Sequence, residues 1–533
     1  MNKGQTFVNG KIFTARGEDE FASAFRVEGG KITWVGDADD VNVADAIDLG
    51  GRTVLPGFID VHTHPTYVAM TLRAVPCTTP LVNDIPGMVE ALKGHPNYGR
   101  GPADWIEGWG YDESKLAERR TPTAADLDLV SHTQPVYVLR SDCHSGICNT
   151  RALALAGITR DTPDPEGARF GRFENGEPNG VLQEHAANDR VLRAKASRDY
   201  ESKVAAVAGT GRHYDERGIV AVTEMMALAR PSNDLRIYRD AAGRGLRQQA
   251  ALYFTWPSLA EGGAPDLTDD ERRGRVRVAG LKLFADGSVS GRTAWMCCPY
   301  RGGDGRGYST LSDADLQAGY EWARRNRVQV AVHAMGDRAL RRVIDFFADK
   351  EPWMGARTPS VRLEHATMLD EAQMRRMRES RMVFGVGTQI IFFFAEHDSY
   401  AENLTEGQYR RAYPVRSLYE MVEHVGLSSD APATTWADPD NVFVSIKAAV
   451  TRRAYNGAEI VREQAVTVPQ AVLLYTARAA SVAPFDGRLG RIAAGFEASF
   501  VVLDRDIFAA DADEIDRTAV LQTWIRGEMV YAR

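Results

Sequence analysis

Eight short apolar runs in the middle of the chain constrain its fold more than any other feature. They lie at 57–64, 218–225, 249–254, 280–287, 328–334, 360–366, 382–388 and 426–430, and helix-like segments such as 313–326, 336–350 and 370–379 follow several of them. Runs that are apolar on both faces and are separated by helices indicate parallel strands covered by helices. Eight such units predict an α/β fold built on a (β/α)8 TIM-type barrel.

The two ends of the chain differ from the middle, because short β-rich segments with turn signals occupy both. TFVNGKIFTA near the start has an Asn-Gly turn, and VLQTWIRGEMVYAR ends the chain. Chain ends often lie close together, so we expect a composite β-sandwich domain built from both termini. About 150 residues separate the first two predicted strands, far more than a crossover needs, which predicts an inserted α/β cap over the barrel mouth. The predicted parts are 1–54 plus 486–533 for the sandwich, 55–71 plus 200–485 for the barrel, and 72–199 for the cap.

Charge and cysteine content exclude several classes of protein. With 64 Lys and Arg against 72 Asp and Glu, the net charge of −8 does not indicate a nucleic-acid partner. Five scattered cysteines are too few for a disulfide framework and favour a reducing compartment. The sequence shows neither a signal-peptide pattern nor an apolar run of membrane-spanning length, so we expect a cytoplasmic protein without a membrane partner. A homodimer is the expected oligomer, because closed dimers are the commonest.

Side chains that could hold a metal ion stand at or near the ends of the predicted strands. In a (β/α)8 barrel this rim is where active sites are built. His62 and His64 are two positions apart on one predicted strand, so their imidazoles point to the same face. Imidazole is the commonest protein ligand for zinc and similar ions, which predicts a divalent metal centre. The candidate donors are His62, His64, Lys282, His333, His365 and Asp430.

Lys282 and Asp430 each allow two interpretations. A lysine within the apolar run GLKLF needs a lost or paired charge. A neutral amine adds carbon dioxide to become an anionic carbamate that can bridge two cations; the alternative is a structural ion pair with Asp286. Asp430 could ligate a metal and accept a proton from water, or simply cap the turn that follows it.

The segments GFIDVHTH, GLKLFADGS, VAVHAMGDRAL, RLEHA and SSDAP resemble the amidohydrolase superfamily. The resemblance is greatest to its YtcJ-like branch, which includes N-substituted formamide deformylases. It implies one ion held by His62, His64, carboxylated Lys282 and Asp430, and a second held by Lys282, His333 and His365. Whether one or both sites fill is left open, and zinc suits the donors, as do iron, manganese and nickel. Glu224 would matter as a bridging carboxylate if Lys282 were unmodified.

The implied activity is metal-dependent hydrolysis of a non-peptide C–N bond, in a small-molecule amide that resembles an N-substituted formamide. Metal-activated hydroxide would attack the carbonyl, with Asp430 as proton shuttle. We predict a catalytic set of Asp430, His365 and His144, and substrate contacts from His144, Trp295, Gln389 and Phe392. His144 reads equally well as a surface histidine. The aromatic residues that could line an apolar pocket read equally well as core packing; they are Trp105, Trp109, Trp295, Phe392, Phe393 and Phe394.

Two other classes of function stay open at this point. A deaminase, a carbamate hydrolase or a lactone hydrolase would use the same nucleophile on the same site. A non-catalytic regulatory protein on this scaffold is the other class, since a fold alone does not determine a function. The full set of donor residues favours an enzyme.

Overall fold

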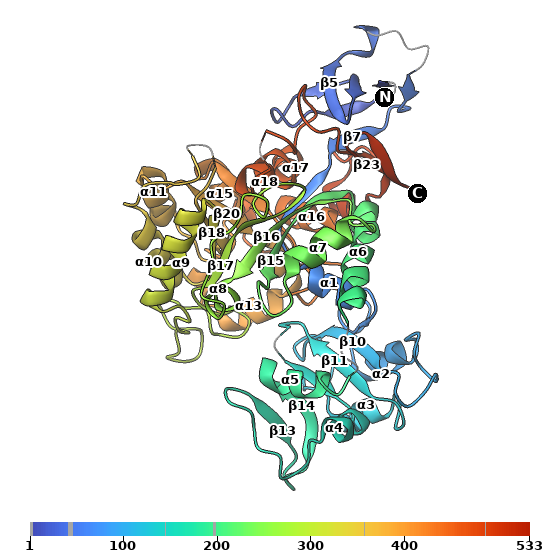
Figure 1. Ribbon diagram of the computed structural model, residues 1–533, viewed down its shortest axis with the longest axis vertical. Helices are drawn as coiled ribbons and strands as arrows, with labels where there is room; N and C mark the ends of the chain where they lie inside the picture. The colour runs from blue at the N-terminus through green and yellow to red at the C-terminus, as the bar shows by residue number, and fades with distance from the viewer. Residues whose placement is uncertain (1–3, 41–45, 144, 196–198, 356–357, 486) are drawn as a thin grey trace. The chain divides into compact units, whose positions relative to one another are not determined.

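The computed structural model describes residues 4–40, 46–143, 145–195, 199–355, 358–485 and 487–533 (Figure 1). It divides into two compact units, which are described one at a time. The first holds Met1–Pro65, Val207–Ser429 and Asp440–Arg533, and the second holds Thr66–Ala206 and Asp430–Pro439. The division into three parts that we predict from the sequence stays a prediction.

The first unit contains the predicted barrel, an eight-stranded sheet in which neighbouring strands are parallel. The strands lie in the sheet in chain order, and every predicted apolar run overlaps one of them. The strands are β8 (Phe58–Thr63), β15 (Ile219–Ala227), β16 (Gln249–Thr255), β17 (Val276–Phe284), β18 (Gln329–Ala334), β19 (Val361–His365), β20 (Phe384–Thr388) and β21 (His424–Leu427). The α/β class and the TIM-type barrel are therefore confirmed.

The two edge strands of this sheet, β8 and β21, meet through a buried side chain. Asp60 in β8 accepts hydrogen bonds from the Ser429 N–H at 3.2 Å and from the Ser429 hydroxyl at 2.5 Å, just after β21. Burial raises the pKa of Asp60 to about 7. The first and last strands are thus tied together close to the end where His62 and Asp430 lie.

Strand β17 begins at Val276, earlier than the predicted start at 280. The difference comes from Arg277, a charged residue that argues against a buried strand when only the sequence is known. Its guanidinium donates to the Gly274 carbonyl at 3.0 Å and to the Pro484 carbonyl at 2.6 Å, and lies 5.1 Å from the centre of the Phe485 ring. With its donors satisfied in this way, Arg277 can extend the strand.

Helices follow the strands and cover the sheet, as expected for this fold (Figure 1). The three predicted helices are α9 (Asp313–Asn326), α10 (Asp337–Phe347) and α11 (Glu371–Glu379). Ser312 and Asp370 begin α9 and α11 with side chains that accept a backbone N–H of the first turn. The other main helices of this unit are α7 (Asp234–Ala242), α12 (Ile390–Ala395), α15 (Val415–Met421), α16 (Val442–Thr451), α17 (Val468–Tyr475) and α18 (Ala477–Val482), and α6 (Tyr200–Arg217) belongs to it from Val207 onward.

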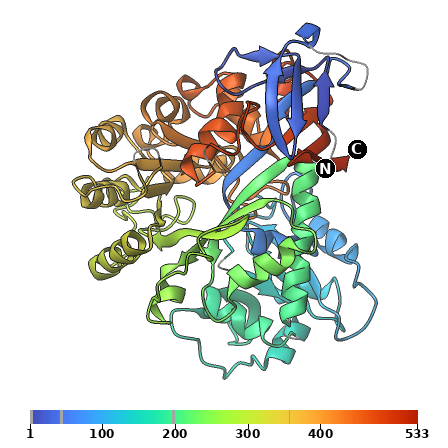
Figure 2. The same cartoon turned by 45° about the horizontal axis from the view of Figure 1, so that its top comes forward.

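Strands from both ends of the chain lie side by side in the first unit (Figure 2). One sheet has the order β24-β23-β22-β7-β2-β3, and a smaller one has the order β5-β4-β1-β6. That these sheets form a β-sandwich domain stays a prediction. The strands are β1 (Gln5–Val8), β2 (Lys11–Phe13), β3 (Phe21–Ala22), β4 (Ala24–Glu28), β5 (Lys31–Gly36), β6 (Ile47–Asp48), β7 (Thr53–Pro56), β22 (Phe500–Leu503), β23 (Val520–Ile525) and β24 (Glu528–Ala532).

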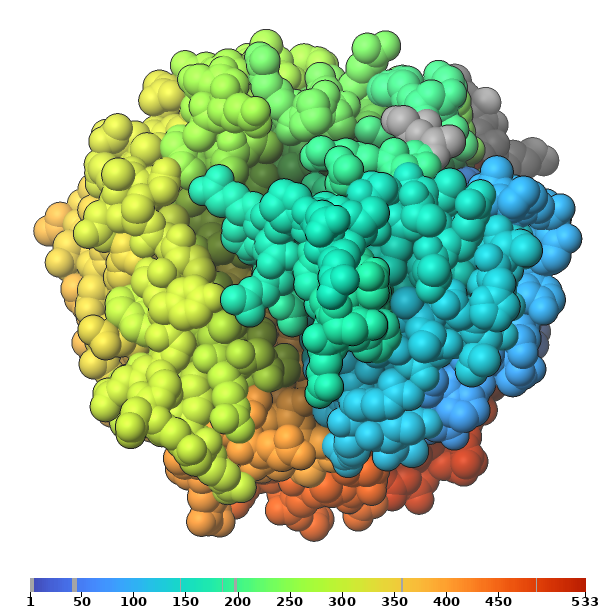
Figure 3. Space-filling model, turned by 90° about the horizontal axis from the view of Figure 1, so that it is seen from below, coloured from blue at the N-terminus to red at the C-terminus, as the bar shows by residue number. Residues whose placement is uncertain are grey.

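The second unit has its own mixed sheet, in the order β13-β14-β12-β11-β10-β9. Its strands are β9 (Val75–Pro76), β10 (Ile106–Tyr111), β11 (Val136–Arg140), β12 (Gly146–Cys148), β13 (Arg169–Arg172) and β14 (Pro178–Gln183), and its helices include α2 (Ile85–Lys93), α3 (Ala124–Asp128), α4 (Thr150–Ala156) and α5 (His185–Leu192). These residues form the blue-to-turquoise surface in Figure 3. Among the helices of both units, as far as the structure describes them, none is both long and apolar enough to cross a membrane.

The aromatic core around Phe7 generates a stability prediction. Phe7 is fully buried, and the centre of its ring lies 4.7 Å from the ring centre of Phe25 and 5.1 Å from those of Phe500 and Trp524. It therefore joins strands from both chain ends. We expect Phe7→Ala to lower the free energy of unfolding by about 3–5 kcal/mol, measured by urea unfolding with tryptophan fluorescence. Phe173→Ala, at a side chain that is 42% exposed, should cause a much smaller loss. Equal losses would contradict this interpretation of the core.

Candidate metal centre

Three of the predicted donors come together at one end of the barrel. His62 lies in β8, His365 ends β19, and Asp430 follows β21. Each is buried, and one potential ligand atom from each lies within 4.8 Å of the other two. Two imidazole nitrogens and a carboxylate oxygen at this separation are a donor set that suits zinc and similar divalent ions.

Backbone conformation directs two of these three side chains. His365 has φ of 68° and Asp430 has φ of 55°, both in the left-handed region that side chains other than glycine rarely adopt. Such residues cannot continue a strand, which is why Asp430 stands beyond the last paired residue of β21 and does not end it as expected from the sequence. Strained backbone of this kind concentrates at functional sites.

Both histidines of this trio are held in the neutral form. Burial, reinforced by the charge of Lys282, lowers the pKa of His62 well below its usual value. Burial and the neighbouring His333 do the same to the pKa of His365. A neutral imidazole carries the lone pair that a metal ion needs, so the electrostatics agree with the geometry.

Lys282 and His333 lie next to the trio. The Lys282 Nζ atom is 3.4 Å from His62 Nε2, and the His333 ring centre is 4.3 Å from that of His365. The Asp286 carboxylate accepts hydrogen bonds from the backbone N–H groups of Met335, Gly336 and Trp295, which gives it a structural role apart from Lys282. Burial raises the pKa of Asp286 to about 7.

The ring orientations of His333 and His64 follow from their partners. His333 Nε2 lies 3.0 Å from the Gly287 carbonyl, to which it can only donate, so its Nδ1 carries the lone pair. His64 Nδ1 lies 3.4 Å from Glu224 Oε1, and the His64 ring centre is 5.6 Å from that of His62. Glu224 therefore contacts His64 and does not stand in the trio.

The predicted substrate residues divide into three cases. Phe392 lies against His365, with its ring stacked and its centre 6.0 Å away, and the Gln389 side chain donates to the Ser428 hydroxyl at 3.0 Å. Trp295 lies under the Arg338 guanidinium, 4.5 Å from the ring centre. His144 lies outside the described residues. Of the other aromatic candidates, Phe393 packs against Tyr400, Tyr409 and Tyr413, and Trp105 belongs to a hydrophobic core of the second unit.

Comparison with known proteins identifies the family of the chain that carries this candidate metal centre. The profile of the amidohydrolase family matches residues 45–531. The chain belongs to the amidohydrolase family. The predicted enzyme class is thereby confirmed: this amidohydrolase is a metal-dependent hydrolase of carbon–nitrogen bonds.

Relatives of this amidohydrolase match it over nearly the full length. It is 28% identical to the N-substituted formamide deformylase of Arthrobacter pascens, over 99% of this chain and 98% of that one. It is 27% identical to the putative amidohydrolase YtcJ of Bacillus subtilis strain 168, over 98% of each chain. An uncharacterized metal-dependent hydrolase from Pyrococcus horikoshii shares its fold with a TM-score of 0.74 at 24% identity, covering 96% of this chain and 99% of that one.

Two buried residues at this amidohydrolase's candidate metal centre are not among the predicted ones: Glu364, which contacts His62, and Arg362, which contacts Glu364. Both belong to β19, and the Glu364 carboxylate lies 2.7 Å from His62 Nδ1. A signal was present in the run VRLEH, where two charged residues alternate with apolar ones in a strand predicted to be buried on both faces.

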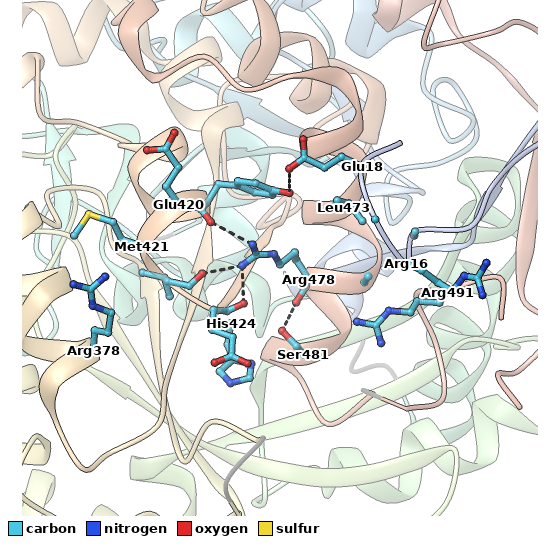
Figure 4. Close-up of a pocket in the computed structure, with 16 residues that line it drawn as sticks. Arg16, Glu18, Arg378, Glu420, Met421, His424, Leu473, Arg478, Ser481 and Arg491 are labelled. Atoms are coloured by element: carbon cyan, nitrogen blue, oxygen red, sulfur yellow. Dashed lines mark hydrogen bonds between the residues drawn. The ribbon is translucent and has the colours of Figure 1, made fainter. Parts of the chain in front are cut away.

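A cavity of about 750 Å³ opens at the start of β21, beside His424 (Figure 4). The Arg478 guanidinium donates there to the carbonyls of Val422 at 3.0 Å and Glu423 at 2.9 Å. Tyr419 donates to Glu18 at 2.7 Å. Active sites of such barrels stand at the opposite strand ends, and the polar groups here hold the protein's own segments together. This cavity is therefore not the candidate site of the amidohydrolase.

Metal removal tests the donor trio. An ion that binds only the folded protein stabilises it by about 2.7 kcal/mol at a free concentration of 100 times Kd, so a chelator should lower the unfolding temperature of the wild type. His365→Ala should abolish that chelator-induced shift. His95→Ala should retain it, because the buried His95 ring hydrogen-bonds the Arg73 carbonyl and the Asn97 N–H, each at 3.0 Å. A full shift in His365→Ala would contradict the assignment.

Proposed function

We propose that this amidohydrolase cleaves the C–N bond of a small non-peptide amide, of the N-substituted formamide kind. The observation that carries the proposal is the buried trio of His62, His365 and Asp430, with ligand atoms within 4.8 Å of one another. The full-length similarity to an N-substituted formamide deformylase supports this bond type. Catalysis would take place at this end of the barrel.

The donor assignment has His62, His64, carboxylated Lys282 and Asp430 around one divalent ion, with Lys282, His333 and His365 around a second. Donors that would serve two neighbouring ions must lie close together. The 3.4 Å between Lys282 and His62 and the 4.3 Å between the rings of His333 and His365 support this assignment. Zinc is the metal that we propose.

When bound, a divalent ion polarises the amide carbonyl and makes a water molecule acidic enough to supply the nucleophile near neutral pH. Asp430 accepts the proton of the attacking water on a carboxylate oxygen and returns it to the departing amine nitrogen. Phe392, which lies against His365, would contact the substrate, together with Gln389, Trp295 and His144. Such a site favours an amide with an apolar amine substituent.

Asp430→Asn tests the proton transfer. The amide keeps an oxygen ligand but cannot accept a proton, so we expect kcat to fall by about 100- to 10,000-fold with metal content unchanged. Metal content is measured by mass spectrometry and kcat by amine release. Asp215→Asn, at a buried carboxylate bonded to Gln248 at 2.8 Å, should leave kcat near the wild-type value. Near-normal turnover by Asp430→Asn would exclude the shuttle role.

A substrate panel tests the bond type. N-formyl, N-acetyl and ester compounds with aryl and alkyl leaving groups should be ranked by kcat/KM, with N-formyl amides that carry apolar substituents expected first. Preference for small charged amides, or for esters, would contradict the proposal.

Lys282→Ala tests the carbamate. Without a bridging anion, the metal content per chain should fall toward zero, and added short carboxylates should restore part of it. The wild type should show a carbamate carbon signal in NMR after incubation with ¹³C-bicarbonate. Lys447→Ala, at a lysine paired with Asp516 at 2.9 Å, is the control and should keep its metal. Normal occupancy in Lys282→Ala without added carboxylate would exclude the carbamate.

A further inference from the structure

We propose that Glu364 is a positioning residue for the metal centre, and that Arg362 holds Glu364 in place. Glu364 would keep the His62 imidazole in the tautomer and orientation that present Nε2 to the ion. The inference rests on the proposed metal site and adds two residues that act through His62.

The contact between Glu364 and His62 is short and dry. Glu364 Oε2 lies 2.7 Å from His62 Nδ1, and the two side chains are 0% and 1% exposed. An ionised carboxylate only accepts hydrogen bonds, so Nδ1 carries the hydrogen and Nε2 carries the lone pair. The Nε2 atom is the one that faces Lys282, at 3.4 Å from its Nζ. Glu364 therefore selects the nitrogen that a metal can use.

Arg362 fixes both Glu364 and the strand that carries His62. Its Nε lies 2.8 Å from Glu364 Oε1, and its Nη2 donates at 3.3 Å to Oε2, the oxygen that contacts His62. Its Nη2 donates at 2.6 Å to the carbonyl of Val61, the residue before His62, and its Nη1 donates at 2.8 Å to the Tyr253 hydroxyl. The Nη1 and Nη2 atoms of one rigid guanidinium thus hydrogen-bond β16, β8 and the Glu364 carboxylate. Burial alone would lower the pKa of Arg362, but the charge of Glu364 reverses this effect and the pKa is raised.

The barrel also leaves space for this carboxylate. A Cβ atom added at Gly387 in the adjacent strand β20 would lie 2.7 Å from Glu364 Oε2. Any larger residue at position 387 would therefore displace the oxygen that contacts His62. Glycine at this position is needed for the contact itself.

Stability alone does not account for a fully buried ion pair. Well-packed apolar residues commonly match or exceed the stability of such a pair, because removing two charges from water costs several kcal/mol per ion. A pair in which one carboxylate oxygen also contacts a predicted metal ligand has a second use, which is to orient that ligand. Arg362 and Glu364 therefore serve the site as well as the core.

Replacing Glu364 by its amide isostere separates shape from chemistry. In Glu364→Gln, both ends of the amide face Arg362, and the end at the Oε2 position also faces His62. If the amide oxygen takes the Oε1 position, the NH2 group donates to His62 Nδ1 and moves the imidazole hydrogen to Nε2, where it blocks metal binding. If the oxygen faces His62, the NH2 group meets the donors of Arg362. Either arrangement weakens the site without changing side-chain volume.

The experiment measures Zn²⁺ affinity by competition with a chromophoric chelator, and the visible absorption spectrum of the Co²⁺-substituted protein. Loss of an outer-shell partner typically lowers metal affinity by about 10- to 100-fold, so we expect that loss in Glu364→Gln, together with a changed Co²⁺ spectrum. Asp215→Asn removes another buried carboxylate and should change neither quantity. Equal affinity and an equal spectrum in Glu364→Gln would overturn the proposal.

A pair of glycine variants tests the contact without removing any charge. Gly387→Ala should move the Glu364 carboxylate and lower Zn²⁺ affinity. Gly385→Ala, two residues earlier in β20, meets Pro359 at 2.9 Å and should leave the affinity unchanged. If Glu364→Gln does not fold, this pair decides, and equal affinities in the two variants would overturn the proposal. Failure of the wild type itself to bind Zn²⁺ would instead overturn the proposed function.

Discussion

Charged side chains can occupy the interior of this barrel only if each finds a partner there, and the metal centre depends on that constraint. An unpartnered buried charge costs several kcal/mol. Arg362 and Glu364 meet the constraint together, as an ion pair whose second carboxylate oxygen accepts the Nδ1–H of His62. Asp60 meets it by accepting hydrogen bonds from Ser429, which also ties the two edge strands of the sheet. The contacts that satisfy the interior thus also orient the donors.

Backbone conformation and strand register complete what the buried partners begin. Pairing between β18 and β19 sets Ala334 beside His365, so His333 and His365 stand one step apart on neighbouring strands. Left-handed backbone at His365 and at Asp430 ends the regular strand geometry and directs these side chains to His62. The local conformation is unfavourable for such residues, and the well-packed strands on either side maintain it.

The sequence could predict the barrel because its strands are short apolar runs whose ends carry polar residues. All eight runs are strands, and helices 313–326, 336–350 and 370–379 are close to α9, α10 and α11. The same pattern predicted the donors at strand ends, and His62, His365 and Asp430 do meet. The alternation in VRLEH marks Glu364 as unusual but does not assign it to the site, because its partner His62 is 302 residues away along the chain. Only the curvature of the eight-stranded sheet, in which β8 is an edge strand and β19 an inner one, brings the two together.

The polar interior continues from the metal centre toward the other end of the barrel. Arg362 donates to the Tyr253 hydroxyl, which donates in turn to Gln329 at the start of β18. The Gln329 amide then donates to the carbonyls of Pro359 at 2.7 Å and Val482 at 3.1 Å. Because every member of this chain has a partner, its side chains hold one another in single orientations. In such barrels, residues at the N-terminal ends of the strands usually serve stability and those at the opposite ends serve catalysis. Here one series of hydrogen bonds reaches both ends of the strands. The packing that stabilises the N-terminal end of the barrel therefore also determines how precisely His62 is held.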